Sequence, residues 1–209
     1  GLKSELFDGI DLTLWQGEIL GLYGLVGSGR TELAKTIIGE RRFTSGSMLV
    51  RGKQAKIGSV AESLQRYRIG YVSENRKEEG LILSASVTSN LTITIWNRLR
   101  SRLLRILKPR REVDQALKMI QRLDIKTPGP LQILINLSGG NQQKVSIGKW
   151  LVADCDILIL DEPTIGVDVG AKEYLHDLIW KMAKEEGKSI ILISSDMPEI
   201  IKLASRILV

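Results

Sequence analysis

At residues 24–31 the chain reads Gly-Leu-Val-Gly-Ser-Gly-Arg-Thr, between an apolar run at Ile19–Tyr23 and a helical pattern at Arg30–Ile38. The stretch fits the phosphate-binding pattern G-x-x-x-x-G-K-[ST] except at the lysine, which is Arg30 here. Glycines let backbone N–H groups turn around a phosphate, the helix N-terminus adds positive charge, and Thr31 offers a hydroxyl to Mg²⁺. The alternative is a glycine-rich turn that binds no phosphate. This alternative remains because Arg30 stands where the pattern has lysine, and guanidinium and ammonium groups are not interchangeable at tight sites.

Outward from this loop, short apolar runs alternate with helical patterns, which is typical of parallel strands covered by helices. The expected strands are Ile19–Tyr23, Met48–Arg51, Ile69–Ser73, Ile157–Leu160 and Ile190–Ser194. The expected helices are Arg30–Ile38, Arg111–Leu123, Gly140–Ala153, Ala171–Glu186 and Pro198–Ser205, the last with Ser195 or Asp196 as N-cap. We therefore expect an α/β fold with a parallel sheet, an antiparallel β portion within the first 18 residues, and an inserted helical lobe at about residues 84–138.

Two carboxylates, Asp161 and Glu162, directly follow the apolar run Ile157–Leu160. The carboxyl ends of the strands are where ligands bind in open α/β sheets. Asp161 can hold Mg²⁺ through water, and Glu162 is placed to orient or deprotonate an attacking water. A solvated strand end is the plainer alternative, and the glycine loop weighs against it.

A third element, Leu-Ser-Gly-Gly-Asn-Gln-Gln at residues 137–143, opens the expected helix ahead of the acidic pair. A serine and two glycines at a helix N-terminus form a second anion site, of the kind that reads a terminal phosphate. With this element the sequence resembles the nucleotide-binding domain of ABC transporters, whose signature motif reads LSGGQ. The resemblance covers nearly the whole chain and includes Asp161-Glu162-Pro163-Thr164 and the D-loop aspartate, Asp168.

The particular residues within these motifs point to one subgroup of ABC domains. Residues 24–32, 137–144 and 166–172 look like the second, C-terminal ATP-binding domain of monosaccharide importers of the ribose, galactose and xylose type, in which one polypeptide carries two such domains. The resemblance implies an ABC-type P-loop NTPase core that uses ATP and Mg²⁺. It also implies three partners: a second ABC domain on the same polypeptide, a membrane-spanning permease subunit and, indirectly, a sugar-binding protein. Residues 1–209 would form one such domain, trimmed at both ends, on the cytoplasmic face of the membrane.

The resemblance also implies the site residues. Glu162 is the expected catalytic residue. The expected nucleotide contacts are Gly24, Gly27, Ser28, Gly29, Arg30, Thr31, Glu32, Ser138, Gly139, Gly140, Asn141, Asp168 and Ser195. The expected metal-binding residues are Thr31, Glu74 and Asp161. Because ABC domains pair head to tail, each nucleotide lies between one domain's phosphate loop and the other's signature, so these residues belong to two different sites.

Three positions on the phosphate-loop side depart from the family pattern. Arg30 replaces the lysine, Glu74 replaces the usual Q-loop glutamine, and Ser195 replaces the histidine that senses the γ-phosphate. Loss of one preorganised electrostatic stabiliser commonly costs about 3–4 kcal/mol. We therefore expect slow ATP hydrolysis at the chain's own loop, with Ser138–Gly140 offered to the partner domain's ATP. The alternative is that Arg30 and Glu74 do the usual jobs.

Composition and charge exclude several other classes. The chain is 43% hydrophobic and 26% charged, as in ordinary globular proteins, which excludes a disordered or fibrous chain. Residues 84–111 hold seven basic and no acidic side chains, so this stretch could face the membrane subunit, anionic headgroups or only solvent. Nucleic-acid binding would need interleaved aromatic residues, and only Trp96 lies nearby. The single histidine, His176, excludes a multi-histidine metal site and is expected at the surface.

Two rival function classes remain. One is a soluble ABC ATPase that acts on ribosomes or nucleic acid. Repair and chromosome ATPases separate their phosphate loop from their signature by long coiled coils, whereas only 131 residues separate Arg30 from Asp161, with no heptad array between them. Translation factors of this class would be expected to keep a lysine in both loops. The other class is a regulatory nucleotide-binding module. An ATPase measurement distinguishes such a module from a domain that drives transport by hydrolysing ATP.

Overall fold

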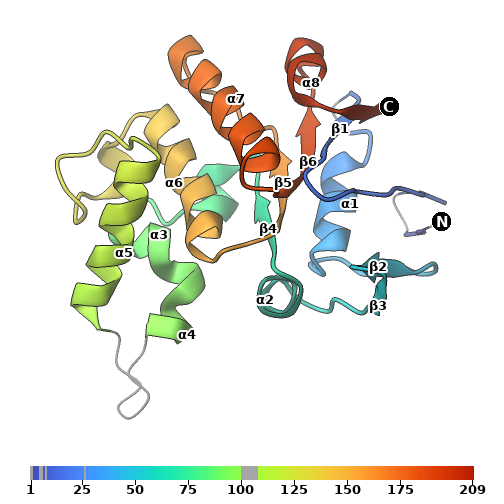
Figure 1. Cartoon of the computed structure of the whole chain (residues 1–209), viewed down its shortest axis with the longest axis horizontal. Coiled ribbons are helices and arrows are strands. Elements are labelled where there is room, and N and C mark those ends of the chain that lie inside the picture. The colour runs from blue at the N-terminus through green and yellow to red at the C-terminus, as the bar shows by residue number, and fades with distance from the viewer. Residues whose placement is uncertain (1, 5–6, 8, 26, 100–107) are drawn as a thin grey trace. The chain divides into compact units, whose positions relative to one another are not determined.

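The computed structural model describes residues 2–4, 7, 9–25, 27–99 and 108–209, and the chain divides into two compact units (Figure 1). The first unit comprises Gly1–Tyr71, Cys155–Pro163 and His176–Val209. The second comprises Val72–Asp154 and Thr164–Leu175. Among the described residues, no helix combines the length and the apolar character that a membrane span requires.

A five-stranded sheet forms the centre of the first unit, in the order β4-β5-β6-β1-β7. Its strands are β1 (Ile19–Tyr23), β4 (Ile69–Val72), β5 (Ile157–Asp161), β6 (Ser189–Ser194) and β7 (Arg206–Leu208). β1 pairs in parallel with β6 and β7, and β5 pairs in parallel with β6. Uninterrupted apolar runs such as Ile190–Ile193 suit strands that are buried on both faces. The expected parallel sheet is therefore confirmed.

Helices cover both faces of this sheet. The helical elements placed wholly in the first unit are α1 (Arg30–Ile37), α2 (Val60–Glu62), the π-helical turn η1 (Ser63–Tyr67) and α8 (Met197–Leu203). Leu20 and Leu22 of β1 share an apolar cluster with Leu33 of α1. Gly21 points the other way, where an added Cβ would lie 3.0 Å from Ile200 of α8. Asp196 caps α8 through the N–H of Glu199, as one of the two expected N-caps.

The fold has the expected antiparallel part beside the parallel sheet, but its paired strands lie beyond the first 18 residues. β2 (Met48–Val50) and β3 (Lys53–Ala55) form a separate antiparallel hairpin, so the strand expected at 48–51 lies outside the parallel sheet. Its two turn residues, Arg51 and Gly52, both have positive φ, as tight hairpins require. Within the described part of the first 18 residues, antiparallel pairing is limited to single bridges, Leu2 with Ile10 and Lys3 with Ser45. The alternation of apolar and polar residues in this segment gives it one apolar face, but it does not provide a partner strand of equal length.

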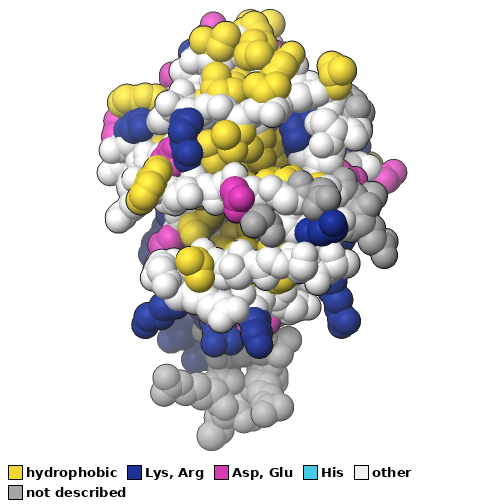
Figure 2. All heavy atoms as spheres, turned by 90° about the vertical axis from the view of Figure 1, so that its right-hand side faces the viewer, with side chains coloured by type: hydrophobic (Ala, Val, Ile, Leu, Met, Phe, Trp, Pro, Cys, Tyr) yellow, Lys and Arg dark blue, Asp and Glu magenta, His cyan; other side chains and the backbone are white. Residues whose placement is uncertain are grey.

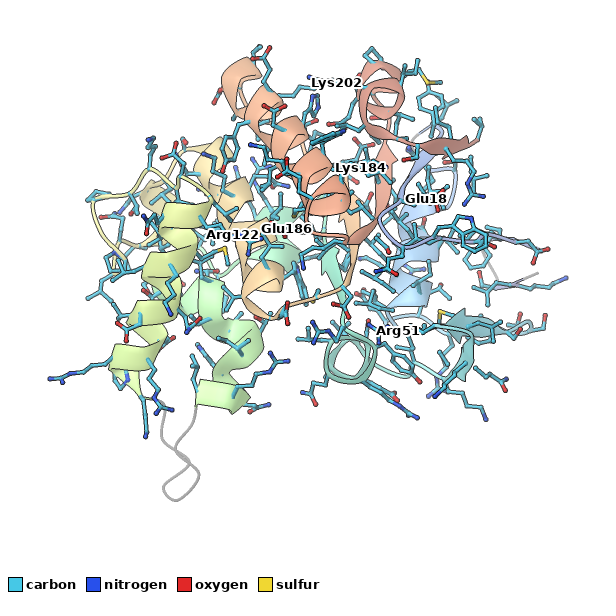
Figure 3. The ribbon with its side chains drawn as sticks, in the orientation of Figure 1. Glu18, Arg51, Arg122, Lys184, Glu186 and Lys202 are labelled. Atoms are coloured by element: carbon cyan, nitrogen blue, oxygen red, sulfur yellow. The ribbon has the colours of Figure 1, made fainter. Side chains whose placement is uncertain are left out.

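A buried carboxylate fixes the start of β1 to the edge of the sheet. Glu18 pairs with Arg206 of β7 at 2.9 Å and accepts a hydrogen bond from the N–H of Trp15. Burial alone would raise the pKa of Glu18, but these bonds and the nearby charge of Lys184 lower it below its usual value. Figure 3 labels Glu18 and Lys184, the latter near the end of α7 (Val169–Lys184), a helix whose residues are shared between the two units.

The second unit is built from packed helices. They are the π-helical turn η2 (Arg76–Gly80), α3 (Val87–Thr92), η3 (Ile93–Ile95), α4 (Trp96–Leu99), α5 (Pro109–Arg122), η4 (Leu134–Asn136) and α6 (Gly139–Val152). Figure 1 shows α3, α5 and α6 together. Gly148 allows this approach, because an added Cβ would lie 2.7 Å from Leu91 of α3 and 3.0 Å from Leu123. Leu99, at the end of α4, is also buried.

Positive charge is unevenly distributed over the surface. Figure 2 shows Lys and Arg side chains gathered at the lower end of the face that it presents, and hydrophobic side chains exposed over its upper part. In the basic stretch 98–111, the described basic residues are Arg98, Lys108, Arg110 and Arg111; the other three lie outside the described residues. Exposed lysines and arginines of this kind raise the local potential and can attract anionic partners.

A buried lysine in α6 makes stability depend on pH. The Lys149 ammonium donates to the carbonyl of Gly80, and burial lowers its pKa to about 8. The unfolded chain therefore binds more protons between pH 8 and about 10.5, and the free energy of unfolding rises with pH across that window.

We expect Lys149→Met to remove this dependence. Relative to the variant, the native chain should gain roughly 3 kcal/mol between pH 7 and pH 10.5, as measured by denaturant unfolding. Lys118→Met, at an exposed position of α5, is the control and should leave the pH dependence unchanged. Parallel pH profiles for the native chain and Lys149→Met would contradict the assignment.

Candidate functional site

The loop between β1 and α1 has the backbone that its glycines predict. Gly27 and Gly29 both have φ of +86°, and Gly29 is the N-cap of α1. At Gly24, an added Cβ would lie 2.8 Å from the Oγ of Ser28. No side-chain hydrogen bond from the cap residue satisfies the first N–H groups of α1. Those groups, on the described part of the loop, are therefore positioned for an anion.

Arg30 does not extend freely from this loop. Its Nη1 donates to the carbonyl of Ser194 at 2.9 Å, and its Nη2 donates to the carbonyl of Leu25 at 3.2 Å. The same Nη2 lies 4.0 Å from Oε1 of Glu162. The guanidinium thus ties the loop to the residues at the carboxyl ends of β5 and β6.

The two carboxylates after β5 have different surroundings. Asp161 is buried, and its Oδ2 accepts a hydrogen bond from the Tyr71 hydroxyl at 2.9 Å. Glu162 has a φ of +47°, a strained conformation for a residue with a side chain, and its Oε1 accepts from the N–H of Ser195 at 2.7 Å. The structure therefore brings Arg30, Glu162 and Ser195 together at one edge of the sheet.

The first unit offers hard oxygen ligands rather than a closed metal cage. Thr31 stands in the first turn of α1, and Asp161 ends β5. Among the described residues, no group of three or more His, Cys, Asp or Glu side chains could hold a metal ion. This donor set fits Mg²⁺, which commonly takes one or two protein ligands and completes its shell with phosphate and water. Glu32, in the same turn as Thr31, also supplies an acidic group near the positive end of the helix.

The signature residues lie in the second unit, at the start of α6. Ser138 is exposed and is the N-cap of this helix, without a side-chain bond to its N–H groups. The Nδ2 of Asn141 donates to the Oγ of Ser138 at 2.9 Å, and the Oδ1 of Asn141 accepts from the N–H of Lys126 at 2.8 Å. Because the Ser138 oxygen accepts one bond here, its own hydrogen remains to be donated elsewhere.

Both signature glycines lie where a side chain would collide. An added Cβ on Gly139 would lie 3.0 Å from the carbonyl of Gly166, and one on Gly140 would lie 2.7 Å from Ala171. Asp168 accepts from the N–H of Ala171 at 2.8 Å. A cavity of about 290 Å³ is lined by Asp124, Lys126, Ser138, Gly140, Asn141, Lys144, Asp168, Gly170, Ala171 and Tyr174. Ser138, Gly140, Asn141 and Asp168 are thus brought together.

Glu74 does not line this cavity. It lies in the second unit, is exposed, and lines a smaller hollow of about 200 Å³ with Arg76, Ile165 and Gly166. Its expected part in metal binding stays a prediction.

Sequence reasoning missed some residues and misplaced one. Tyr71 and Arg76 had no motif to mark them. The surface position expected for His176 is wrong: the side chain is buried, with its Nε2 2.8 Å from Oε1 of buried Glu199. The signal was present, because Ile179 and Ala183 follow His176 at helical spacing and are buried.

Comparison with known proteins adds the decisive observation: a family model described as ABC transporter matches residues 7–165. The chain belongs to the ABC transporter family. ABC ATPases bind ATP, normally with Mg²⁺. This ABC domain superposes on a dimeric post-hydrolysis structure of the ATP-binding cassette MJ0796 bound to ADP and Pi, with a TM-score of 0.83 and 21% identity over 99% of this chain and 90% of that chain. The expected α/β P-loop fold is confirmed.

Curated relatives of this ABC domain are sugar import ATP-binding proteins. It is 45% identical over 206 residues to the ribose import ATP-binding protein RbsA of Clostridium perfringens, covering 99% of this chain and 40% of that protein. It is 44% identical over 200 residues to the arabinose import ATP-binding protein AraG of Yersinia pestis, covering 96% of this chain and 38% of that protein. The chain thus spans about 40% of the length of these relatives.

Proposed function

We propose that this chain is the C-terminal of two ABC domains in a sugar-importer ATPase, and that it serves mainly the ATP held by its partner domain. The names of the relatives support the importer over a soluble ATPase that acts on ribosomes or nucleic acid. The chain's 40% share of their length supports a second domain on the same polypeptide. The observation that carries the proposal is the engagement of the Arg30 guanidinium by protein carbonyls.

The chain's own phosphate loop is poorly prepared for fast hydrolysis. A lysine ammonium at position 30 would rotate freely toward a phosphate, whereas the Arg30 fork is held by two carbonyl oxygens. Its charge also lies beside the Glu162 carboxylate, whose Oε1 already accepts from Ser195. Mg²⁺, when bound with ATP, would neutralise phosphate charge beside Thr31 and Asp161. We propose that this loop, including Gly24, Gly27, Ser28, Gly29 and Glu32, holds nucleotide without rapid turnover.

The signature residues, in contrast to the phosphate loop, are well prepared to contact a phosphate. The Ser138 hydroxyl is exposed, is fixed by Asn141, and has a hydrogen available for a phosphate oxygen. It stands at the uncapped N-terminus of a 14-residue helix, where the helix dipole favours an anion. Such a preorganised donor stabilises charge that develops on a transferred phosphoryl group. We propose that Ser138, Gly139 and Gly140 act in this way on the partner's ATP, with Asp168 at the rim of the same cavity.

An exposed apolar strip in the second unit provides a surface for the membrane subunit. Leu131, Ile133 and Ile135 alternate with buried Leu134 and are all exposed. The N–H of Ile135 donates to the carbonyl of Leu83, which places this strip beside exposed Ile82. Exposed apolar patches of this kind mark interaction sites. We propose that a permease subunit docks here, which places the domain on the cytoplasmic face of the membrane and links it indirectly to a sugar-binding protein.

ATP turnover by the chain alone tests the proposal. We expect a rate about 100-fold below that of the intact importer, because its own loop lacks the usual stabilisers. Glu162→Gln should change that residual rate by no more than about twofold, since the carboxylate is already engaged. Turnover like that of the intact importer, abolished by Glu162→Gln, would show that the local site is competent and would overturn the proposal.

A further inference from the structure

A buried arginine in η2 stands against the signature turn. Arg76 is only 8% exposed and begins η2, whose N-cap is Asn75. Its Nη1 donates to the carbonyl of Ile165 at 2.8 Å and its Nη2 to the carbonyl of Gly166 at 3.2 Å. Among the residues that the structure describes, it forms no ion pair with a carboxylate, and its Nε has no hydrogen-bond partner. A buried cation with only neutral partners is costly, so packing alone does not explain why an arginine stands here.

The same guanidinium lies beside the first residue of α6. An added Cβ on Gly139 would lie 3.1 Å from Nη2 of Arg76 and 3.0 Å from the carbonyl of Gly166. Arg76 therefore fills the space between the signature turn and the segment at 165–166 that leads to Asp168. A fork with two parallel N–H donors can hold two successive carbonyls at once, which an ammonium group cannot do in the same way.

The other end of η2 is also attached to α6. The Lys149 ammonium donates to the carbonyl of Gly80, and an added Cβ on Gly80 would lie 3.5 Å from the Oγ of Ser146. Residues 76–80 thus contact α6 near its first residue and again about ten residues later. Because both ends are attached, the side chain of Arg76 has a fixed base from which to hold the signature turn.

We propose that Arg76 is a positioning residue for the signature turn, setting the placement of Ser138 and Gly139 relative to the 165–168 segment. The proposal rests on the proposed function, in which this turn acts on the partner domain's ATP. Arg76 itself touches no nucleotide in this scheme. It acts through Gly139 and through the carbonyls of Ile165 and Gly166.

Steady-state ATPase measurements on the intact importer test this role. Arg76→Met should lower kcat by about 100-fold with KM for ATP changed by less than about threefold, because a misplaced donor costs the transition state more than nucleotide binding. Arg76→Lys should recover about tenfold of that loss, since one carbonyl can still be bonded. Lys118→Met, which removes an exposed cation of the same unit outside the basic stretch, is the control and should leave both constants unchanged.

A double-mutant cycle separates positioning from general destabilisation. Gly139→Ala places a methyl group against the Arg76 guanidinium and should lower kcat on its own. Combined with Arg76→Met, the loss in kcat should be at least about fivefold smaller than the product of the two single losses, because both changes disturb one contact. The melting temperature of each variant is measured in parallel, and a common loss of folding would appear there.

Each outcome has a distinct meaning. If Ser138→Arg leaves the importer active, the proposed function fails, whatever Arg76 does. If Ser138→Arg is inactive but Arg76→Met keeps its kcat, the positioning role alone is overturned. Strictly multiplicative losses in the cycle, or equal losses in Arg76→Met and Arg76→Lys that follow a fall in melting temperature, would also overturn it. A coupled loss of kcat with unchanged melting temperature supports it.

Discussion

Ser138→Arg is expected to lower the ATPase rate of the intact importer by about 100- to 1,000-fold, the usual cost of losing a preorganised phosphate-binding donor. Ser138 lines the cavity of about 290 Å³, so an arginine side chain there would extend into the space that we propose holds the partner's nucleotide. It would also remove the oxygen that accepts from Asn141. The effect should appear in kcat for the whole protein, although this chain's own phosphate loop is unchanged.

Ser138→Ala is the matched control for this experiment. It removes the hydroxyl but keeps the cavity open and leaves the N–H groups of α6 in place, so a loss of about tenfold is expected. A graded series, in which alanine is mild and arginine severe, would separate steric exclusion from the loss of a single hydrogen bond. An unchanged rate in Ser138→Arg would mean that the signature of this chain does not serve the partner's ATP.

Gly39→Ala is expected to destabilise the chain by about 2–5 kcal/mol, from backbone strain and overpacking together. Gly39 follows the end of α1 with a φ of +76°, a position that favours glycine after a helix. An added Cβ would lie 2.7 Å from the carbonyl of Ile57 and 2.8 Å from the N–H nitrogen of Ser59. Both are backbone atoms and cannot rotate away, so the end of α1 or the segment at 57–59 must shift.

Gly52→Ala isolates the cost of the backbone conformation alone. Gly52 has a φ of +73° in the β2–β3 turn, but nothing lies within 4 Å of an added Cβ. It should therefore cost only about 1–2 kcal/mol in denaturant unfolding, the penalty of a left-handed conformation. Equal losses at the two glycines would show that the close contacts around Gly39 relax without cost.

Most of the parallel sheet could be predicted from the sequence because its strands are buried on both faces. β1, β5 and β6 are uninterrupted apolar runs, and the glycine loop and acidic pair mark their carboxyl ends. β3 and β7 were missed because each has three residues and carries lysine or arginine. The strand at 48–51 was assigned to the wrong sheet, since an apolar run does not specify its pairing partner.

Local motifs pointed to the candidate site residues, whose roles stay predictions, but they did not reveal the contacts that these residues make. Motif spacing identified Arg30, Glu162 and Ser138, because those positions are defined by local sequence. The bond from Arg30 to Ser194 spans 164 positions, and the contact of Arg76 with Gly166 spans 90. Such long-range contacts depend on how the chain folds back on itself, and no local pattern encodes them.

The short side chain of Asn141 links the signature hydroxyl to a loop that carries no recognisable motif. Asn141 reaches both the oxygen of Ser138 and the N–H of Lys126, so the orientation of that hydroxyl depends on the main chain just after α5. If Ser138 acts as proposed, substitutions in Thr127–Pro130 should alter phosphate recognition although none of these residues belongs to a motif. Engineering of this protein should therefore treat the Lys126–Pro130 loop as part of the proposed signature site rather than as a spacer.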